Sequence, residues 1–386
     1  MSELREGHRI IRYDVLLVAC ILLLTALGLV TLYSASYIYS LNRYADGMRF
    51  LKNNLIGLIF GAAGFFIAYF FPLEWLKKKN LIITLVLLTV FINILPFLKP
   101  FQSTSENSDA RRWIYFFGGP HSFQPSEIIK VILPIYLAYI LDKNKEKLKA
   151  FFFVLFPSLF WTGLFCALIL LQKNFSDTVF IAAIAIMIFY IGGIRKREIL
   201  FVVLALVLIV LLIYIGDDDG KIKKRIDDYK NKNGYQIERS FEAVNSGGFW
   251  GKGIGQGTYK IKTPEVPSDF IFASYAEESG FIGVLIYFGI LAFFVYAGFR
   301  EAWRCQDRFG QILAFSLVMT IATQSLMNIA VVINLVPTTG ITLPFVSSGG
   351  SSLMMTLVSA GFIINVSKRN YGKYAGGKYA DGGRYV

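Results

Sequence analysis

The sequence predicts an all-α integral membrane protein with ten transmembrane helices and a large outer loop between helices seven and eight. Three observations predict this fold class. Of the 386 residues, 55% are hydrophobic and 17% are charged, and the mean hydropathy is +0.54, which exceeds what soluble domains carry. Apolar stretches long enough to cross a bilayer recur along the chain. Lys and Arg gather in the short connections between these stretches, as they do in membrane proteins.

The spans are expected wherever about 20 mostly apolar residues follow one another. Ten segments qualify, some with polar interruptions, and they lie near residues 14–33, 53–71, 80–98, 125–141, 151–171, 177–194, 198–215, 270–299, 309–334 and 349–367. The first is too long for a signal peptide and no small-residue cleavage site follows it, so we interpret it as a retained span.

Clusters of positive charge predict the orientation of the spans. They occur at the N-terminus and in every second connection: Arg5, Arg9 and Arg12, then residues 77–79, 143–149, 195–197 and 300–308. Short loops rich in Lys and Arg stay in the cytoplasm. We therefore expect both termini inside, and we expect the segments 99–124 and 216–269 outside, where they are large enough to build a site.

Residues 1–370 are expected to form one membrane domain, followed by a tail at 371–386. The tail repeats Gly, Tyr, Lys and Ala without apolar periodicity, which predicts a disordered cytoplasmic segment. The net charge of +13 lies in the connections between spans, so no nucleic-acid partner is expected. Two His and three Cys offer neither a metal-ligand spacing nor a disulfide framework.

Glu127 and Lys130 are charged residues inside the fourth expected span. Such residues cost about 2.5–3.5 kcal/mol each at a helix centre, so they face a cavity or a partner. Their spacing puts both on one helix face, where they can form an ion pair. Gln124-Pro125-Ser126 before them is typical of a helix start, which predicts a place near the outer surface. Two interpretations stay open: a structural salt bridge, or part of a site for a polar substrate.

The long outer segment changes character along its length. Residues 217–232 alternate acidic and basic side chains and predict a solvated run. Residues 235–244 place apolar side chains at helical spacing, which suits a helix lying in the membrane interface. The glycine-rich residues 247–257 suit a tight turn that lets backbone approach a ligand or another helix; a phosphate-binding loop is the alternative, although no strand precedes it.

Asp269 lies between two prolines and the apolar start of the eighth span. It could be the N-cap of that helix. Glu277 and Glu278 follow two turns later, and the spacing from Asp269 to Glu277 predicts that both lie on one helix face. A carboxylate at the outer membrane surface beside an apolar groove can act as a general base.

The connection at 334–352 carries no charge and is rich in Gly, Pro, Ser and Thr. This composition at membrane depth predicts a non-helical segment that is buried in protein or lines a cavity. For residues 349–352, close helix packing through small side chains is an equal alternative.

Three long motifs, in order along nearly the whole chain, resemble those of the SEDS family (shape, elongation, division and sporulation), which includes FtsW and RodA. The motifs are Ala110-Arg111-Arg112-Trp113 with Gln124-Pro125-Ser126-Glu127 and Lys130; Gly251–Gly255 with Pro264-Glu265, Ser268-Asp269-Phe270 and Glu277-Glu278; and Asn328, Pro337–Gly340 and Leu343–Phe345 with Gly349–Ser352.

The resemblance implies a peptidoglycan glycosyltransferase of the bacterial inner membrane that polymerises lipid II, with its active site on the outer face. Residues 253–257 and 342–345 favour the division member over the elongation member. The resemblance also implies a class B penicillin-binding protein as the partner transpeptidase, other divisome or elongasome proteins, and surrounding membrane lipid. Asp269 takes the place of the essential aspartate, and Glu127 and Lys130 take the places of the family's intramembrane pair.

By this resemblance, Asp269 is expected to take the proton from the acceptor sugar as a general base in an inverting reaction. The pyrophosphate charge would be met by Arg111, Arg112 or Lys130, or by a divalent cation such as Mg or Mn near Asp269. The other supporting residues are expected to be Lys252, Glu277, Glu278, Ser351 and Ser352. A flippase for lipid-linked precursors and a non-catalytic division scaffold are the alternative functions.

The sequence departs from the family pattern at three places. Pro267 stands where a histidine is common, Ser348 where a tyrosine is common, and Gln172–Asp177 where members often show Gln-Pro-Asp-Leu-Gly. These changes leave the assignment of Asp269 intact, and they remove any role that depends on the replaced groups.

Overall fold

The computed structural model describes residues 12–101, 111–115, 122–148, 152–216, 235–262 and 266–380, with single residues between 216 and 235. Each of the ten expected spans coincides with a helix in these ranges. They are α2 (Arg12–Tyr44), α3 (Arg49–Phe70), α4 (Lys79–Ile94), α5 (Ser126–Lys143), α6 (Leu155–Leu171), α7 (Phe175–Ile191), α8 (Lys196–Ile215), α12 (Ile271–Arg304), α13 (Arg308–Val332) and α14 (Gly350–Ala380).

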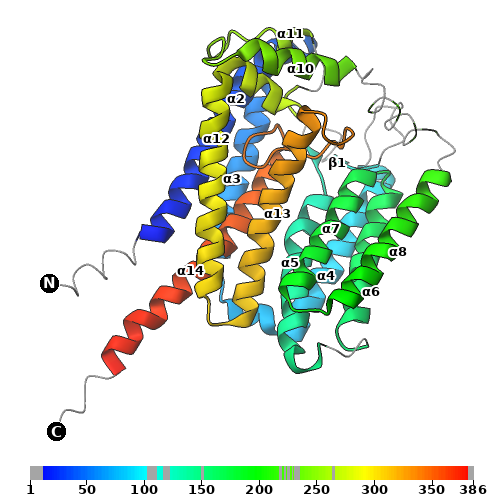
Figure 1. The fold of residues 1–386 in the computed structure, drawn as a ribbon, viewed down its shortest axis with the longest axis vertical. Helices are drawn as coiled ribbons and strands as arrows, with labels where there is room; N and C mark the ends of the chain where they lie inside the picture. Colours follow the sequence, from blue (N-terminus) through cyan, green and yellow to red (C-terminus); the bar gives the residue numbers. More distant parts are fainter. Residues whose placement is uncertain are drawn as a thin grey trace.

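The fold class is confirmed, since these elements form an all-α bundle (Figure 1). In the described part of the chain, seven helices are long and apolar enough to cross a membrane. Two further helices, α6 and α7, are apolar but shorter, and α5 carries the charged Glu127 and Lys130. That all ten cross the membrane stays a prediction.

Short elements connect the long helices. They are the 3₁₀ turns η1 (Leu73–Lys77), η2 (Leu95–Phe97), η3 (Lys99–Phe101) and η4 (Lys145–Lys147), the strands β1 (Ile114–Tyr115) and β2 (Ser122–Phe123), and the helices α10 (Tyr235–Gly247) and α11 (Tyr259–Lys262). The two strands pair antiparallel, Ile114 with Phe123. The helix expected at 235–244 is therefore confirmed, whereas most of the solvated run at 217–232 lies outside the described residues.

The two ends of the chain differ in how far they can be described. The backbone of α14 is helical as far as Ala380, beyond the span expected at 349–367 and into the segment for which we expected disorder. Residues 381–386 and the N-terminal residues 1–11 lie outside the described residues. The division into a membrane domain and a disordered tail stays a prediction.

The inner helices of the bundle pack closely because small residues face one another. Gly57 of α3 lies against Gly350 of α14, where an added Cβ would stand 2.5 Å from the Gly350 Cα. One turn on, a Cβ at Gly61 would stand 3.0 Å from the Cα of Met354. Small residues let helix backbones approach in a membrane, where van der Waals contact drives association. In contrast, α8 has no buried residue and lies at one edge of the bundle (Figure 1).

One end of the bundle gathers the basic connections. Lys77 pairs with Asp307 at 2.7 Å, and Arg369 pairs with Glu74 at 2.8 Å. The hydrogen bond from Arg369 holds the pKa of the Glu74 carboxyl below its ordinary value. The start of α2 and the end of α14 lie on this side of the bundle (Figure 1). Two of the expected basic connections, at 77–79 and 300–308, therefore meet at this end.

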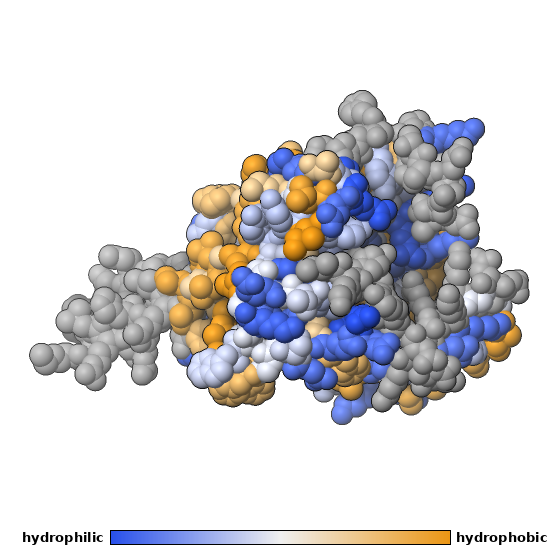
Figure 2. Space-filling view, turned by 90° about the horizontal axis from the view of Figure 1, so that it is seen from above, coloured by the Kyte–Doolittle hydropathy of each residue, from blue (hydrophilic) through white to orange (hydrophobic). Residues whose placement is uncertain are grey.

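The opposite end carries α10, which lies across the tops of the long helices (Figure 1). Seen from above this end, hydrophilic residues gather on the face and hydrophobic residues lie around the sides (Figure 2). An apolar girdle around a polar end face is what a bilayer-spanning bundle requires.

The helix α12 is broken at Gly280, whose φ of 64° and ψ of −167° are not helical. The glycine-rich segment after α10 is hydrogen-bonded into this break: Lys252 N donates to Glu277 O and Gly253 N to Glu278 O, both at 3.0 Å. In return, Phe281 N donates to Gly248 O at 2.9 Å. The glycine-rich residues therefore form the tight turn that approaches another helix, and the two donors named here are used by protein rather than by a phosphate.

The segment between α13 and α14 is non-helical, as predicted. Ile341 and the run Leu343–Ser347 are buried, and Asn334 and Phe345 adopt positive φ of 52° and 65°. Asn328 from α13 donates to the Ile341 carbonyl at 2.8 Å and satisfies one of its buried acceptors. Irregular backbone at this depth is tolerated because protein, not lipid, surrounds it.

Candidate functional site

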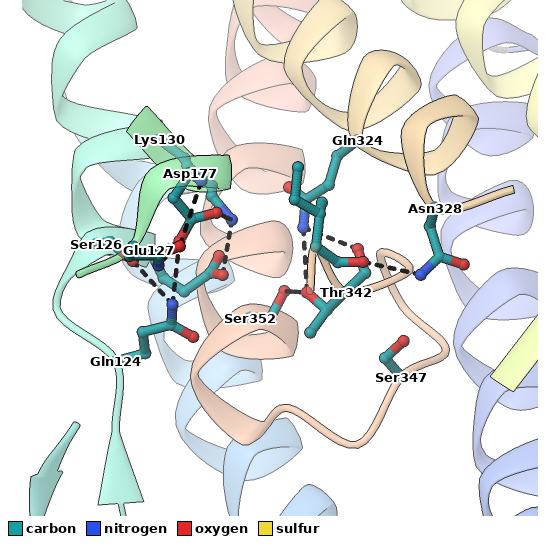
Figure 3. A network of polar contacts seen from close by, with 12 residues as sticks. Gln124, Ser126, Glu127, Lys130, Asp177, Gln324, Asn328, Thr342, Ser347 and Ser352 are labelled. Atoms are coloured by element: carbon teal, nitrogen blue, oxygen red, sulfur yellow. Dashed lines mark hydrogen bonds and ion pairs between the residues drawn. The ribbon is translucent and has the colours of Figure 1, made fainter. Parts of the chain in front are cut away.

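A buried cluster of charges lies at the first turn of α5. Lys130 Nζ is 2.7 Å from Glu127 Oε1 and 3.6 Å from Asp177 Oδ1. Each of the three side chains is at most 5% exposed. The expected ion pair is confirmed as a contact, and it has a second carboxylate that we did not predict. One cation therefore stands between two carboxylates (Figure 3).

Asp177 is held by three donors from two elements. Its Oδ2 accepts hydrogen bonds from Ser126 Oγ at 2.9 Å, from Gln124 Nε2 at 3.1 Å and from Asn174 Nδ2 at 2.7 Å. Asn174 is also the N-cap of α7, because its side chain accepts from the Asp177 backbone N–H. Three donors and one nearby ammonium stabilise the ionised carboxylate away from water.

A row of hydroxyl and amide groups continues from this cluster toward the segment between α13 and α14 (Figure 3). Ser352 lies beside the Glu127 carboxylate, and its Oγ is 2.8 Å from Thr342 Oγ1. Gln324 Nε2 donates to the same Thr342 hydroxyl at 3.2 Å. The predicted residue Ser352 therefore connects the ion pair to the non-helical segment.

Asp269 stands on the other side of that segment, just before α12. Asn328 Nδ2 donates to the Asp269 carbonyl at 2.9 Å. Ser347 Oγ donates to the Ser268 carbonyl at 2.6 Å, and Ser348 N donates to the Pro267 carbonyl at 2.8 Å. The carbonyls of Pro267 and Ser268 are thus bonded to the irregular segment and that of Asp269 to α13, and these bonds hold the backbone of Asp269 in place.

The helix-cap interpretation of Asp269 is wrong. The helix α12 begins at Ile271, and its N-cap residue is Phe270, whose side chain makes no cap hydrogen bond. Asp269 therefore precedes the helix, so the helical spacing that was expected to place it on one face with Glu277 does not apply. Its side chain lies near Gly340, where an added Cβ would stand 3.6 Å from Asp269 Oδ2.

A cavity of about 710 Å³ opens next to this segment. Ser268, the neighbour of Asp269, lines it together with Ser351 and the amide of Asn54. Apolar side chains also line it, among them Phe60 of α3, which is 62% exposed. The cavity therefore combines polar and apolar lining. That Ser351 supports a substrate stays a prediction.

The two arginines of the first motif lie near the outer end of the charge cluster. Arg111 is exposed and Arg112 is partly buried. Arg112 donates to the backbone carbonyl of Lys173, in the connection between α6 and α7. That connection also carries Asn174, which binds Asp177.

Glu277, Glu278 and Lys252 form a second group on the broken part of α12. Lys252 Nζ is 2.6 Å from Glu277 Oε1, and Lys260 Nζ is 2.7 Å from Glu278 Oε1. The structure brings these three predicted residues together with one another and with the outer segment. Lys260 and Ser34, which also bind Glu278, were not predicted.

The described residues offer few protein ligands for a divalent cation. In that part of the chain no group of three or more His, Cys, Asp or Glu side chains lies close enough to hold a metal ion. A cation near Asp269 would have one protein carboxylate and would need phosphate oxygens as further ligands, which is how Mg²⁺ is often held.

The model of the cell cycle protein family FtsW/RodA/SpoVE matches residues 14–372. The chain belongs to this family. A probable peptidoglycan glycosyltransferase FtsW from Geobacter sp. (strain M18) is 35% identical, with 95% of this chain and 99% of that protein covered. The protein of the same description from Bacillus subtilis (strain 168) is 34% identical over 92% and 90%. Stage V sporulation protein E of that strain is 33% identical over 94% and 98%.

Solved structures share the family's fold. One is a chain from a structure described as "Structural coordination of polymerization and crosslinking by a peptidoglycan synthase complex". It superposes with a TM-score of 0.73 at 23% identity, covering 92% of this chain and 97% of that one. The rod shape determining protein RodA of Thermus thermophilus superposes with a TM-score of 0.66 at 23% identity, over 92% and 96%. The predicted SEDS membership is therefore confirmed.

Proposed function

We propose that this chain is a peptidoglycan glycosyltransferase that polymerises lipid II during cell division, with Asp269 as its general base. Relatives with this described activity are 31–35% identical over more than nine-tenths of the chain. Their description as FtsW favours division over elongation. The family resemblance supplies the role of Asp269, and the geometry around it supports that role.

The observation that carries the proposal is the cavity lined by Ser268, the residue before Asp269. A lipid-linked sugar has an apolar chain and a polar head, and this cavity is lined by side chains of both kinds: Phe50, Phe60 and Met354 are apolar, and Asn53, Ser268 and Ser351 are polar. Few well-placed polar groups in an otherwise apolar concavity are typical of ligand sites.

The chemistry needs a single base. The acceptor sugar's hydroxyl oxygen attacks the donor's anomeric carbon, the bond from that carbon to the pyrophosphate oxygen breaks, and the hydroxyl proton passes to the Asp269 carboxylate. The pyrophosphate departs as an anion and needs no proton, unlike the leaving group of a glycosidase, which uses two carboxylates. Attack from the opposite face inverts the anomeric centre. A positioned base contributes about 10²–10⁴ in rate.

Charge on the leaving group calls for cations at the outer end of the cavity. Lys130 already stands between Glu127 and Asp177, so its charge is compensated within the protein. We therefore assign the pyrophosphate to Arg111 and Arg112, since guanidinium groups bind phosphate oxygens in a bidentate manner. A divalent cation shared by Asp269 and the phosphates would supply further charge neutralisation there.

A class B penicillin-binding protein is the proposed partner, together with other proteins of the division machinery. Support comes from the related chain that was solved within a peptidoglycan synthase complex. The proposed location is the inner membrane with both termini in the cytoplasm, because the basic connections at 77–79 and 300–308 meet at the end of the bundle where α2 starts and α14 ends. The cavity and Asp269 then face the outer side, where lipid II is polymerised.

A flippase and a non-catalytic scaffold are the competing functions. A carrier needs polar groups near the bilayer midplane, whereas Glu127 lies in the first turn of α5 and Asp269 just precedes α12. This favours an enzyme that works at one surface.

The test is reconstitution of the purified chain in liposomes with labelled lipid II, with and without a class B partner. We expect glycan strands that grow with time. Movement of lipid II between leaflets without glycan would support the flippase, and glycan formed only when the partner carries its own polymerase would support the scaffold.

A further inference from the structure

The two adjacent carboxylates of α12 have partners that the proposed reaction does not use. Glu277 Oε1 accepts from Lys252 Nζ at 2.6 Å and from the Thr258 backbone N–H at 2.9 Å. Its Oε2 accepts from the Tyr259 backbone N–H at 3.0 Å. The Glu277 carboxylate therefore binds two backbone N–H groups at the start of α11 and the side-chain ammonium of Lys252.

Glu278 binds a different set of groups. Ser34 of α2 donates to its carboxylate at 2.7 Å, and Lys260 Nζ donates at 2.7 Å. Lys260 also donates to Ser34 Oγ at 3.0 Å and to the Gly255 carbonyl at 2.9 Å. Lys260 is 3% exposed and Glu278 is 5% exposed. This contact joins α2, α11 and α12 through one buried ion pair.

The position of the two carboxylates follows from the break in α12. The backbone carbonyls of Glu277 and Glu278 have no helical partner beyond Gly280, and the N–H groups of Lys252 and Gly253 satisfy them. A helix break at this depth needs such partners, because an unsatisfied carbonyl is costly away from water. The same two residues thus hold the outer segment by main chain and by side chain.

We propose that Glu277 and Glu278, with Lys252, Lys260 and Ser34, form a carboxylate clamp that positions the outer segment 252–262 for glycan polymerisation, an inference that rests on the proposed function. Glu277 and Glu278 are positioning residues in this account. They do not touch the reacting atoms; they hold the chain that leads to Asp269.

The distance along the chain makes this coupling direct. Only residues 261–265 separate Lys260 from Val266, which is buried beside Pro267, and a residue spans at most about 3.6 Å of chain. The carbonyls of Pro267 and Ser268 are bonded to the segment between α13 and α14, and that of Asp269 is bonded to Asn328 of α13. With the clamp closed, both ends of the short connection are anchored. Without the contact between Lys260 and Glu278, the anchor nearest to Val266 on this side is the backbone bonding of residues 252 and 253 to α12. Ser268, which lines the cavity, is then held less firmly.

The charges of Glu278 and Lys260 can be swapped, whereas those of Glu277 and Lys252 cannot. Glu277 accepts from two backbone N–H groups, so a cation in its place would repel them. The Glu278 carboxylate accepts from the side chains of Ser34 and Lys260, and the Ser34 hydroxyl can donate or accept. The double variant Glu278→Lys with Lys260→Glu therefore keeps the ion pair in reverse and gives up the bond from Lys260 to the Gly255 carbonyl.

The experiment compares Glu278→Gln, Lys260→Met and this exchanged double variant in liposomes with the partner protein. Glu242→Gln is the matched control, because Glu242 lies on α10, outside residues 252–262, forms an ion pair with Arg239 and is 57% exposed. Hydrogen–deuterium exchange of residues 252–262 reports the clamp, and kcat and KM for labelled lipid II report the reaction. We expect the amide hydrogens of residues 252–262 to exchange faster in both single variants than in the wild type. We also expect kcat to fall at least about tenfold in both, since small misplacements near a reacting group cost this much or more. The double variant with swapped charges should regain most of the slow amide exchange and most of the kcat, and Glu242→Gln should match the wild type in both measurements.

Two results would overturn the clamp. In the first, the amide hydrogens of residues 252–262 exchange faster in the single variants, but kcat equals that of the wild type. In the second, these hydrogens exchange as slowly as in the wild type, but kcat is reduced. Where a single variant does not fold, the exchanged variant decides, because a folded but inactive exchanged protein also contradicts the proposal. A wild type that makes no glycan defeats the proposed function instead, and the exchange data still test whether the carboxylates hold the segment.

Discussion

Lys130 is surrounded by groups that compensate its charge. Glu127 and Asp177 flank it, and the ring centre of Phe180 lies 5.5 Å from its Nζ. Burying an ion is costly, and an ion pair repays that cost only when its remaining atoms are also bonded. The three donors to Asp177 meet this condition. The cluster therefore depends on the one cation it contains.

Replacing Lys130 with Met should destabilise the protein strongly. The change leaves two buried carboxylates close together without a cation, and breaking a buried pair in this way costs about 3–5 kcal/mol. Thermal unfolding in detergent would measure the loss. Lys52→Met is the matched control, since Lys52 pairs with Asp46 at 2.8 Å but is 61% exposed, and we expect its unfolding temperature to equal that of the wild type. Equal effects of the two changes would contradict the account.

Asn328→Ala should lower both the rate of polymerisation and the free energy of unfolding. Its amide bridges the carbonyls of Asp269 and Ile341, and each carbonyl left unpaired and buried costs about 1–3 kcal/mol. We expect kcat to fall because the backbone of Asp269 loses an anchor, with KM nearly unchanged. Asn245→Ala on the exposed face of α10 serves as the control. A variant with normal kcat and reduced stability would show that Asn328 is structural only.

Glycine pairs decide how closely the elements α3 and α14 approach. Gly57→Ala should lower the unfolding temperature, because its Cβ would stand 2.5 Å from the Gly350 Cα and 2.6 Å from the Gly350 carbonyl oxygen; overpacking of this kind costs about 1–3 kcal/mol. Gly163→Ala in α6 is the control, since nothing lies within 4 Å of the added Cβ. Unchanged unfolding of Gly57→Ala would mean that the two helices do not pack as described.

The helices could be predicted from the sequence because lipid imposes a length and a composition on each. The boundaries of α7 and α8 differ from the expected spans by at most three residues. The non-helical conformation of the segment before α14 could also be predicted, since uncharged Gly, Pro and Ser at membrane depth suit neither a helix nor an exposed loop.

The partners of the site residues were harder to predict. Asp177 was missed because its sequence context resembles a helix start, and its approach to Lys130 depends on how α7 packs against α5. Glu277 was expected beside Asp269 because regular helical spacing was assumed from one to the other. The helix begins only at Ile271 and breaks at Gly280, and the carboxylates bind the outer segment instead. A local pattern cannot report such a break or what fills it.

One end of the bundle carries α10, and the opposite end carries the start of α2 and the end of α14 (Figure 1), with the ion pairs of Lys77 and Arg369. From this we predict the sidedness of single cysteines placed in a variant whose three native cysteines are replaced. Glu242→Cys on α10 should react with a membrane-impermeant thiol reagent added to intact cells, and Glu146→Cys in η4 should react only after the membrane is opened. Both positions are exposed. The reverse pattern would place the cavity on the cytoplasmic side.

The central claim is that Asp269 accepts the proton during polymerisation of lipid II. The direct measurement is the initial rate of glycan formation by wild type and by Asp269→Asn, reconstituted at equal amounts with the same partner and labelled lipid II. Asn has nearly the same shape, so the hydrogen bond from Asn328 to the backbone carbonyl should persist. The account predicts a loss of about 10²–10⁴ in rate without loss of folded protein. A rate near that of the wild type would contradict it.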